Sequence, residues 1–139
     1  MEVDLAQETC KYVCMVNDDI TKEIIRCAYK VYNTMGFGFL ESVYEKCLLL
    51  ELEASGLTAE AQIPIEVLYE GKEVGNFVAD LIVAETVIIE LKSVTRLVRA
   101  HEVQLVNYLV ATKKDIGLLI NFGEKGVEVK RKTRQLPGR

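Results

Sequence analysis

The chain is predicted to fold as an α/β domain in which helices flank a mixed central sheet. Apolar residues recur at helical spacing in three segments. Five shorter segments are rich in β-branched and aromatic residues and are bounded by turn residues. The predicted order is ααβββαββ, and this mixture of strands and helices favours a sheet that carries helices on its faces.

The first helix is expected to begin where Asp18, Asp19 and Thr21 offer N-terminal caps. Apolar residues then recur every three or four positions over residues 20–35, which predicts one stripe facing a core. The Gly-Phe-Gly sequence at residues 36–38 ends this helix.

A second helix is expected over residues 40–54, ended by Ser55-Gly56. Its inward side chains are predicted to be Leu40, Val43, Tyr44, Cys47 and Leu48. Residues 1–17 support no assignment beyond an additional helix.

Three strands follow, over residues 62–69, 73–84 and 86–93. Glu70-Gly71-Lys72 is typical of a hairpin turn between the first two, and the chain must turn tightly again near Glu85.

A third helix is expected over residues 99–112, and closing strands over residues 115–122 and 127–132. The strand before this helix and the strand after it form a crossover unit. We therefore expect these two strands to be parallel, with a right-handed connection.

The length of 139 residues suits one compact domain, with its core at about residues 18–133. No apolar run approaches the roughly 20 residues that cross a membrane. The first eight residues are acidic and mixed, unlike a signal peptide. A cytoplasmic protein without a membrane partner is therefore expected.

Four cysteines lie in the first third of the chain, at positions 10, 14, 27 and 47. No second cysteine or histidine pair completes a zinc site. Small buried thiols are expected, and a disulfide framework is not.

The net charge of −4 does not indicate a nucleic-acid binder, but its distribution is uneven. Residues 124–139 contain six lysines or arginines and two glutamates, whereas the rest of the chain is acidic. This basic end is compatible with phosphate contact and also with an ordinary solvated tail.

The strongest functional signal is the sequence Val-Ile-Ile-Glu-Leu-Lys-Ser at residues 87–93. Residues two apart in a strand share a face, so Glu90 and Lys92 project together while Val87, Ile89 and Leu91 fill the other face. Asp80 lies inside the preceding apolar run. Buried carboxylates are costly unless they are paired or bind a cation.

Two interpretations of these residues are open. Asp80 and Glu90, with the backbone carbonyl of Leu91, supply the hard oxygen ligands that Mg²⁺ prefers, and Lys92 would stabilise developing negative charge. Alternatively, Lys92 forms a salt bridge with one acid on the strand face.

Other segments supply further candidates. Glu41 lies in the first turn of the second helix, where a carboxylate suits the helix dipole. Gln104 and Tyr108 are four apart on one face of the third helix, and they suit either substrate binding or an ordinary polar helix surface with a half-buried tyrosine. A basic run of Lys92, Arg96, Arg99 and His101 leads into that helix, and a lone histidine is more often structural than catalytic.

The order of these motifs resembles a known superfamily over about residues 20–133. Asp80 followed by Glu90-Leu91-Lys92 resembles the PD-(D/E)xK nuclease signature, and Gln104-x-x-x-Tyr108 resembles the extra motif of its RecB-like branch. Gly38-x-x-Glu41-x-x-Tyr44 matches the motif of the GxxExxY protein family. Ala79 stands where the superfamily usually has proline, and Tyr32 stands where many GxxExxY members have histidine.

The resemblance implies a restriction-endonuclease-like core and a metal-dependent nuclease. It implies Asp80 and Glu90 as ligands of Mg²⁺, for which Mn²⁺ can substitute, and Lys92 as the catalytic lysine. Glu41 would be an auxiliary acid, and Gln104 and Tyr108 would support substrate or site geometry.

The leading hypothesis is a Mg²⁺-dependent hydrolase of phosphodiester bonds in DNA. The alternative is a catalytically silent domain that binds nucleic acid or a protein partner. A third interpretation gives the acids and the lysine a purely stabilising role. Because so small a domain offers limited recognition surface, a homodimer or a larger complex suits any of these.

Overall fold

The structure is a computed structural model that describes residues 5–134, with side chains described from residue 18 onward. Three helices and five strands follow the predicted order ααβββαββ. Their bounds are α1 (Leu5–Met35), α2 (Glu41–Ala54), β1 (Ala59–Tyr69), β2 (Lys72–Val83), β3 (Val87–Lys92), α3 (Arg99–Thr112), β4 (Ile116–Phe122) and β5 (Val127–Thr133). No helix of the described chain is both long and apolar enough to cross a membrane.

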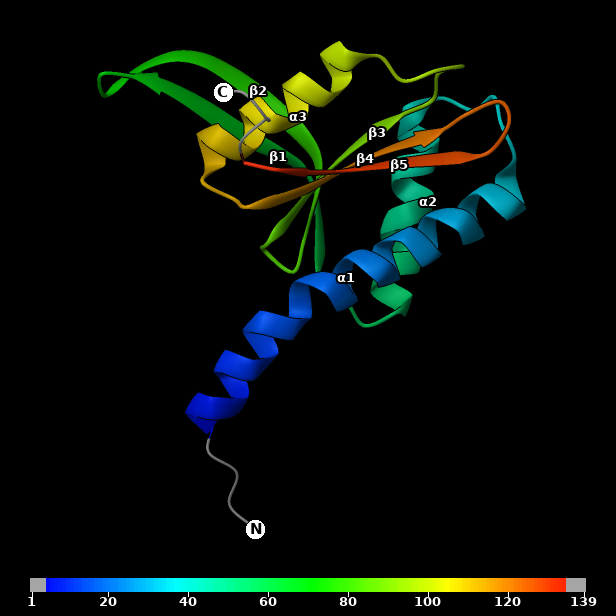
Figure 1. Ribbon diagram of the computed structural model, residues 1–139. Helices are drawn as coiled ribbons and strands as arrows, with labels where there is room; N and C mark the ends of the chain where they lie inside the picture. Colours follow the sequence, from blue (N-terminus) through cyan, green and yellow to red (C-terminus); the bar gives the residue numbers. More distant parts are fainter. Residues whose placement is uncertain (1–4, 135–139) are drawn as a thin grey trace.

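The five strands form one mixed sheet in the order β1-β2-β3-β4-β5. β3 and β4, which are joined through α3, are parallel as predicted, and the other neighbouring pairs are antiparallel. α3 lies on one face of the sheet, and α1 and α2 lie on the other (Figure 1). This arrangement confirms the predicted α/β class.

Alternation along β3 divides its side chains between the two faces as expected. Val87, Ile89 and Leu91 join the core beneath α1 and α2, whereas Ile88 joins the smaller core beneath α3. Glu90 shares the α3 face, because it is two residues from Ile88.

β1 and β2 change faces partway along their length. Ala61 and Leu81 pack in the core under α1 and α2, but Ile63 and Ala79, the next pair, pack in the core under α3. Between them Gln62 has a φ of 56°, a left-handed conformation that is rare inside a strand. This kink gives the sheet an inflection directly beside Asp80.

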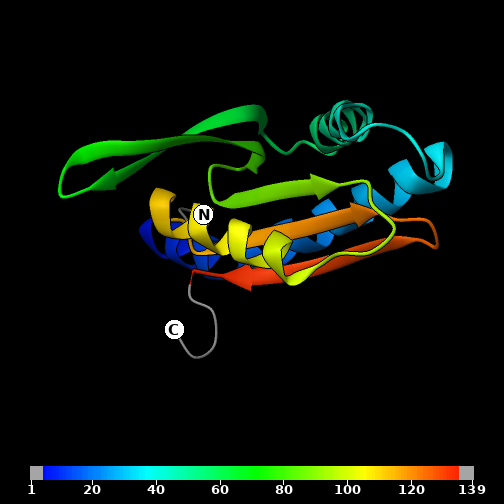
Figure 2. The same ribbon diagram turned by 90° about the horizontal axis from the view of Figure 1, so that it is seen from above.

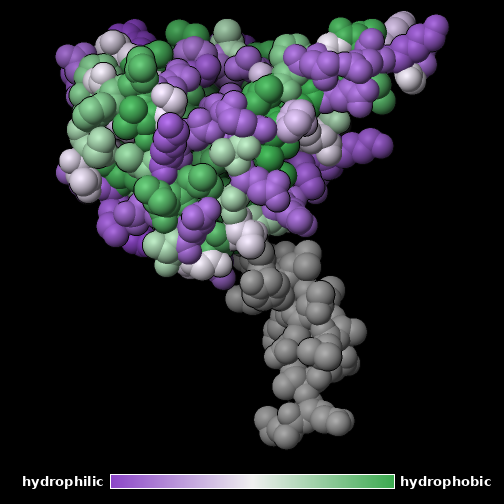
Figure 3. All heavy atoms as spheres, turned by 180° about the vertical axis from the view of Figure 1, so that it is seen from behind, coloured by the Kyte–Doolittle hydropathy of each residue, from purple (hydrophilic) through white to green (hydrophobic). Residues whose placement is uncertain are grey.

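Beyond the kink, β1 and β2 continue as a two-stranded arm. The arm projects past the other strands on the same side of the molecule as α3 (Figures 1 and 2). Seen from behind, it extends from the body with hydrophobic residues among hydrophilic ones (Figure 3). Its exposed apolar side chains include Leu68, Tyr69, Val74, Phe77 and Val78.

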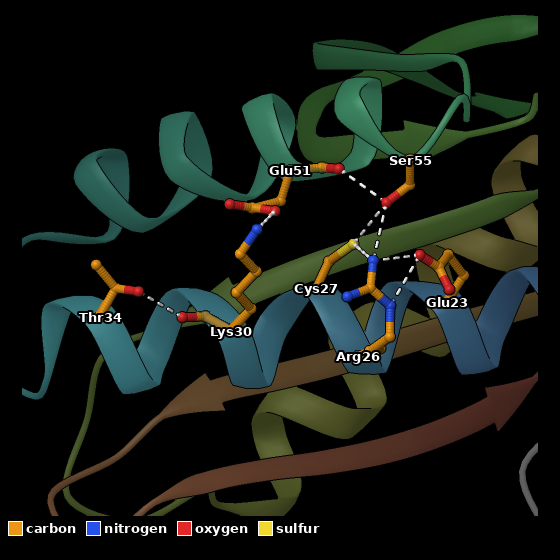
Figure 4. Close-up of polar contacts among 7 residues, drawn as sticks. All are labelled: Glu23, Arg26, Cys27, Lys30, Thr34, Glu51 and Ser55. Atoms are coloured by element: carbon orange, nitrogen blue, oxygen red, sulfur yellow. Dashed lines mark hydrogen bonds and ion pairs between the residues drawn. The ribbon is translucent and has the colours of Figure 1, made fainter.

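Polar contacts pin α1 against the end of α2 (Figure 4). Arg26 Nη2 donates to Ser55 Oγ over 3.1 Å, and Lys30 Nζ lies 3.1 Å from Glu51 Oε2. The buried thiol of Cys27 lies 3.4 Å from Ser55 Oγ. These contacts hold α1 against the C-terminal end of α2.

Two helix predictions require correction. α1 begins at Leu5, so Asp18 and Asp19 lie within the helix and Thr21 Oγ1 donates to the carbonyl of Asp18 instead of capping. Residues 5–17 contain no glycine or proline, the two residues that interrupt a helix most strongly, so the helix extends through them. Leu40 precedes α2 in extended conformation and is 75% exposed, so its side chain does not follow the inward stripe.

The cysteines and the basic end are partly described. Cys27 is a buried free thiol and Cys47 a half-buried one, while the side chains of Cys10 and Cys14 lie outside the described residues. The basic end forms strand β5, not a tail, up to Thr133. Residues 135–139 lie outside the described part. Three cations in the described part of this basic end form ion pairs with the rest of the protein, namely Arg131 with Asp18, Lys132 with Glu102 and Arg134 with Asp115.

Candidate metal centre

Asp80 and Glu90 meet where β2 and β3 part. The backbone pairing of these strands ends at Leu81 and Ile89. Beyond it, the Asp80 N–H donates to Glu90 Oε1 over 3.1 Å, and the Leu91 N–H donates to Asp80 Oδ2 over 2.8 Å. Each carboxylate therefore satisfies a backbone donor of the opposite strand. The second oxygen of each acid has no hydrogen-bond partner among the described residues.

Burial makes this pair electrostatically unfavourable without a cation. Glu90 is only 5% exposed. Burial, followed by the negative charge of Asp80, raises the pKa of Glu90 from 4.5 to about 8. Burial also raises the pKa of Asp80, although the hydrogen bond from Leu91 opposes it. A divalent cation between the acids would offset both effects, because its charge favours the ionised carboxylates.

Lys92 follows on the same face, half-buried at the end of β3. Among the described residues, no salt bridge joins its ammonium to Asp80 or Glu90. Its charge nevertheless lowers the pKa of both acids, which places it within electrostatic range. The direct ion pair of the alternative interpretation is absent, and the ammonium is available to another group.

Asn121 holds the chain that follows Lys92. It pairs with Lys92 in the parallel register of β3 and β4 and is fully buried. Its Oδ1 accepts from the Val94 N–H over 3.0 Å, and its Nδ2 donates to the Val94 carbonyl over 2.9 Å. The amide thereby replaces a missing β-bridge and fixes the strand end that carries Lys92.

Leu91 contributes only its backbone to this site. Its side chain is 1% exposed and packs in the core beneath α1 and α2. Its N–H is already bound to Asp80, so the adjacent peptide lies beside the acids. The role of its carbonyl as a metal ligand stays a prediction.

Glu41 begins α2 and is exposed. Its charge raises the pKa of both Asp80 and Glu90. Ser93 Oγ donates to the Phe39 carbonyl over 2.9 Å, which ties the end of β3 to the loop before α2. Glu41 and Ser93 line one hollow of about 560 Å³. Glu41 therefore faces the same region as the acids.

The contacts of Tyr44 account for the tyrosine three residues after Glu41 in the motif. Its hydroxyl donates to the Gly36 carbonyl and accepts from the Phe39 N–H over 3.3 Å. Its ring stacks on Phe122 with centroids 4.3 Å apart. The tyrosine is a structural anchor for the loop in which Gly38 has a φ of 115°, and this loop delivers Glu41.

Two residues near the site were missed from the sequence. Glu45 raises the pKa of Asp80 more than Glu41 does, and its Oε1 accepts from Gln62 Nε2 over 2.8 Å. The four-residue spacing of Glu41 and Glu45 places them on one face of α2, and this spacing could have identified Glu45 from the sequence. No sequence pattern around Gln62 predicts its left-handed conformation.

α3 brings Tyr108 to the acids and places Gln104 one turn away. Burial, followed by the charges of Glu90 and Asp80, raises the pKa of Tyr108. Gln104 is half-buried and forms no hydrogen bond with either acid within the described structure. His101 Nδ1 accepts from the Val98 N–H over 3.1 Å, so this histidine stabilises the start of α3.

The donor set suits a hard divalent cation that retains water. Within the described side chains, no group of three or more histidine, cysteine or acidic residues is arranged to hold a metal. Mg²⁺ commonly takes only one or two carboxylates and completes its shell with water and substrate phosphate. Asp80 and Glu90 fit that requirement, and their unfavourable proximity favours a cation.

Comparison with known proteins identifies a family and a similar solved structure. The family model for the PD-(D/E)XK nuclease superfamily matches residues 18–133. The crystal structure of SSO0001 matches with a TM-score of 0.55 and 21% identity, over 69% of this chain and 51% of that one. This chain thus spans about half the length of SSO0001. No functionally curated protein matches the chain.

Proposed function

Since the chain belongs to the PD-(D/E)XK nuclease superfamily, we propose that it is a Mg²⁺-dependent nuclease that hydrolyses phosphodiester bonds in DNA. Mn²⁺ would substitute for Mg²⁺. Within the superfamily, the motifs around Glu41 and Gln104 support an assignment to the GxxExxY family and the RecB-like branch.

The observation that carries this proposal is the buried Asp80–Glu90 pair at the parting of β2 and β3. Its reciprocal backbone hydrogen bonds hold both carboxylates in place, and its raised pKa values favour a cation. Asp80, Glu90 and the Leu91 carbonyl would hold the ion. A bound Mg²⁺ would activate a water molecule and neutralise charge on the phosphoryl oxygens.

The remaining residues would act on the substrate and the water. Lys92 would direct its charge at the phosphoryl group as negative charge develops, because no carboxylate occupies it. Glu41 would orient water from the opposite side of the site. Gln104 and Tyr108 would position the substrate from α3.

The test is DNA cleavage by the full chain in Mg²⁺ or Mn²⁺, with single-stranded and double-stranded substrates. Asp80→Asn keeps an oxygen for the Leu91 N–H but removes the charge, and it should abolish cleavage. Lys92→Ala should do the same. Lys72→Ala, a lysine at the hairpin end of β2, is the matched control and should cleave normally. Cleavage that persists in both site variants would refute the proposed site.

A silent nucleic-acid-binding domain is the second candidate function. It is favoured because no group of three or more histidine, cysteine or acidic side chains in the described part of the chain is arranged to hold a metal. Calorimetric titration with Mn²⁺ separates the candidates. Binding that disappears in Asp80→Asn supports the nuclease, whereas the absence of binding in the wild-type chain supports the silent domain.

A further inference from the structure

A groove of about 960 Å³ lies between α3 and the β1–β2 arm. Its lining includes Phe77 from the arm and Arg99, Gln104, Asn107, Tyr108 and Lys113 from α3 and its end. Aliphatic side chains from both elements complete the walls. Neither acid of the proposed metal centre lines it, so the groove is separate from that centre.

An aromatic wall is the distinctive feature of this groove. Phe77 is 45% exposed although it is a large apolar side chain. Its ring centroid lies 5.7 Å from that of Tyr108, with the rings inclined at 40°. Tyr108 is buried and packs against Phe77, so the two rings form one aromatic cluster of which Phe77 is exposed to solvent.

Cations stand at both ends of α3 beside this wall. Arg99 is the first residue of the helix and Lys113 follows its last, so they are separated by about 20 Å along the helix axis. No salt bridge engages either side chain in the described structure. The amides of Gln104 and Asn107 lie between them on the lining, and Glu66 is the one carboxylate among the described lining residues.

Tyr108 connects the groove to the proposed metal centre. This residue lines the groove and packs in one buried cluster with Ala79 and Ile88. Ala79 directly precedes Asp80, and Ile88 is two residues before Glu90 on the same strand face. Tyr108 therefore joins the wall of the groove to the two strands that carry the acids.

We propose that this groove binds an unpaired segment of the substrate strand, with one base stacked on Phe77 and the sugar-phosphate backbone near Arg99 and Lys113. The inference rests on the proposed nuclease function and names its substrate class as single-stranded nucleic acid. Aromatic stacking accepts any base, and cations along a groove follow the backbone. A duplex would not stack a base on Phe77 in this way, because its bases are paired and already stack on one another.

Binding should be measured separately from cleavage. The full chain carrying Asp80→Asn is titrated in EDTA with a fluorescent oligothymidylate, an abasic strand of equal length and a duplex of equal length. Phe77→Leu preserves apolar volume but removes the ring face, and Phe77→Trp preserves a ring. Tyr29→Leu replaces an aromatic residue of similar exposure (47%) on α1, across the sheet, and is the matched control.

Phe77→Leu should weaken oligothymidylate binding about tenfold, as expected for one stacked base. Phe77→Trp and Tyr29→Leu should leave it within about twofold of the parent. The abasic strand should bind the Asp80→Asn chain about as weakly as oligothymidylate binds the chain that also carries Phe77→Leu. Adding Phe77→Leu should not weaken binding of the abasic strand further.

Two results would overturn the inference. One is oligothymidylate affinity unchanged by Phe77→Leu. The other is duplex bound as tightly as the single strand with the same dependence on Phe77, which would indicate a general apolar docking surface. The proposed nuclease activity can be refuted separately. If binding depends on Phe77 but the wild-type chain shows no Mg²⁺-dependent cleavage, the nuclease activity is refuted and single-strand binding in the groove is supported.

Discussion

Replacing Glu90 with glutamine is expected to stabilise the metal-free protein at neutral pH. The pKa of Glu90 rises from 4.5 in the unfolded chain to about 8 in the folded protein. Folded Glu90 therefore holds a proton that the unfolded chain releases throughout this pH window. Stability from this group is fully present below pH 4.5, and it is lost progressively as the pH rises to about 8.

The magnitude follows from the same two values. Each pH unit of the window costs about 1.4 kcal/mol, so the loss between pH 4.5 and pH 7 is at most about 3.5 kcal/mol. Glu90→Gln abolishes the titration but keeps an oxygen to accept the Asp80 N–H, which donates over 3.1 Å. The variant should recover most of that loss, and the recovery should be small at pH 5.

Urea unfolding in EDTA, repeated from pH 5 to pH 8, measures this effect. Glu60→Gln, an exposed acid on β1, is the matched control and should change stability by less than about 0.5 kcal/mol. A Glu90→Gln variant that is less stable than the wild type at pH 7 would refute the reasoning. So would a stability difference that does not grow with pH.

Three further predictions concern the support of the site. Asn121→Ala should destabilise the fold by roughly 2–3 kcal/mol in urea unfolding, because both backbone groups of Val94 lose their partner; a loss below 0.5 kcal/mol would show that this pairing is dispensable. Tyr44→Phe should cost roughly 1–2 kcal/mol in the same assay, because it removes the hydroxyl that anchors the loop but keeps the stack on Phe122; an unchanged midpoint would contradict the anchoring role. Lys92→Ala should abolish cleavage while changing stability by about 1 kcal/mol or less, since no direct ion pair is lost; a loss of several kcal/mol would favour a purely structural lysine.

Much of the fold follows from local pattern. The alternation along β3 correctly predicts that Glu90 lies on the opposite face of the sheet from Val87 and Leu91. This prediction is strong because shifting the strand by one residue would turn its apolar side chains away from the core. The bounds of α3 were predicted at Arg99 and Thr112, where the structure has them. The parallel pairing of β3 and β4 followed from the crossover rule.

Other features depend on tertiary context that periodicity does not carry. The left-handed Gln62 reverses the faces of β1 and β2, yet its sequence surroundings alternate like an ordinary strand. Glu45 approaches Asp80 only because α2 packs across the sheet. The amide of Asn121 looks like a polar interruption of an apolar strand until its pairing with Val94 is seen.

The central claim is that Asp80 and Glu90 hold a divalent cation beside Lys92, and a crystal structure with Mn²⁺ tests it most directly. The account predicts anomalous density between the two carboxylates, in contact with the Leu91 carbonyl, with the Lys92 ammonium free of both acids. Density elsewhere, or no density together with a direct ion pair between Lys92 and either acid, would contradict it.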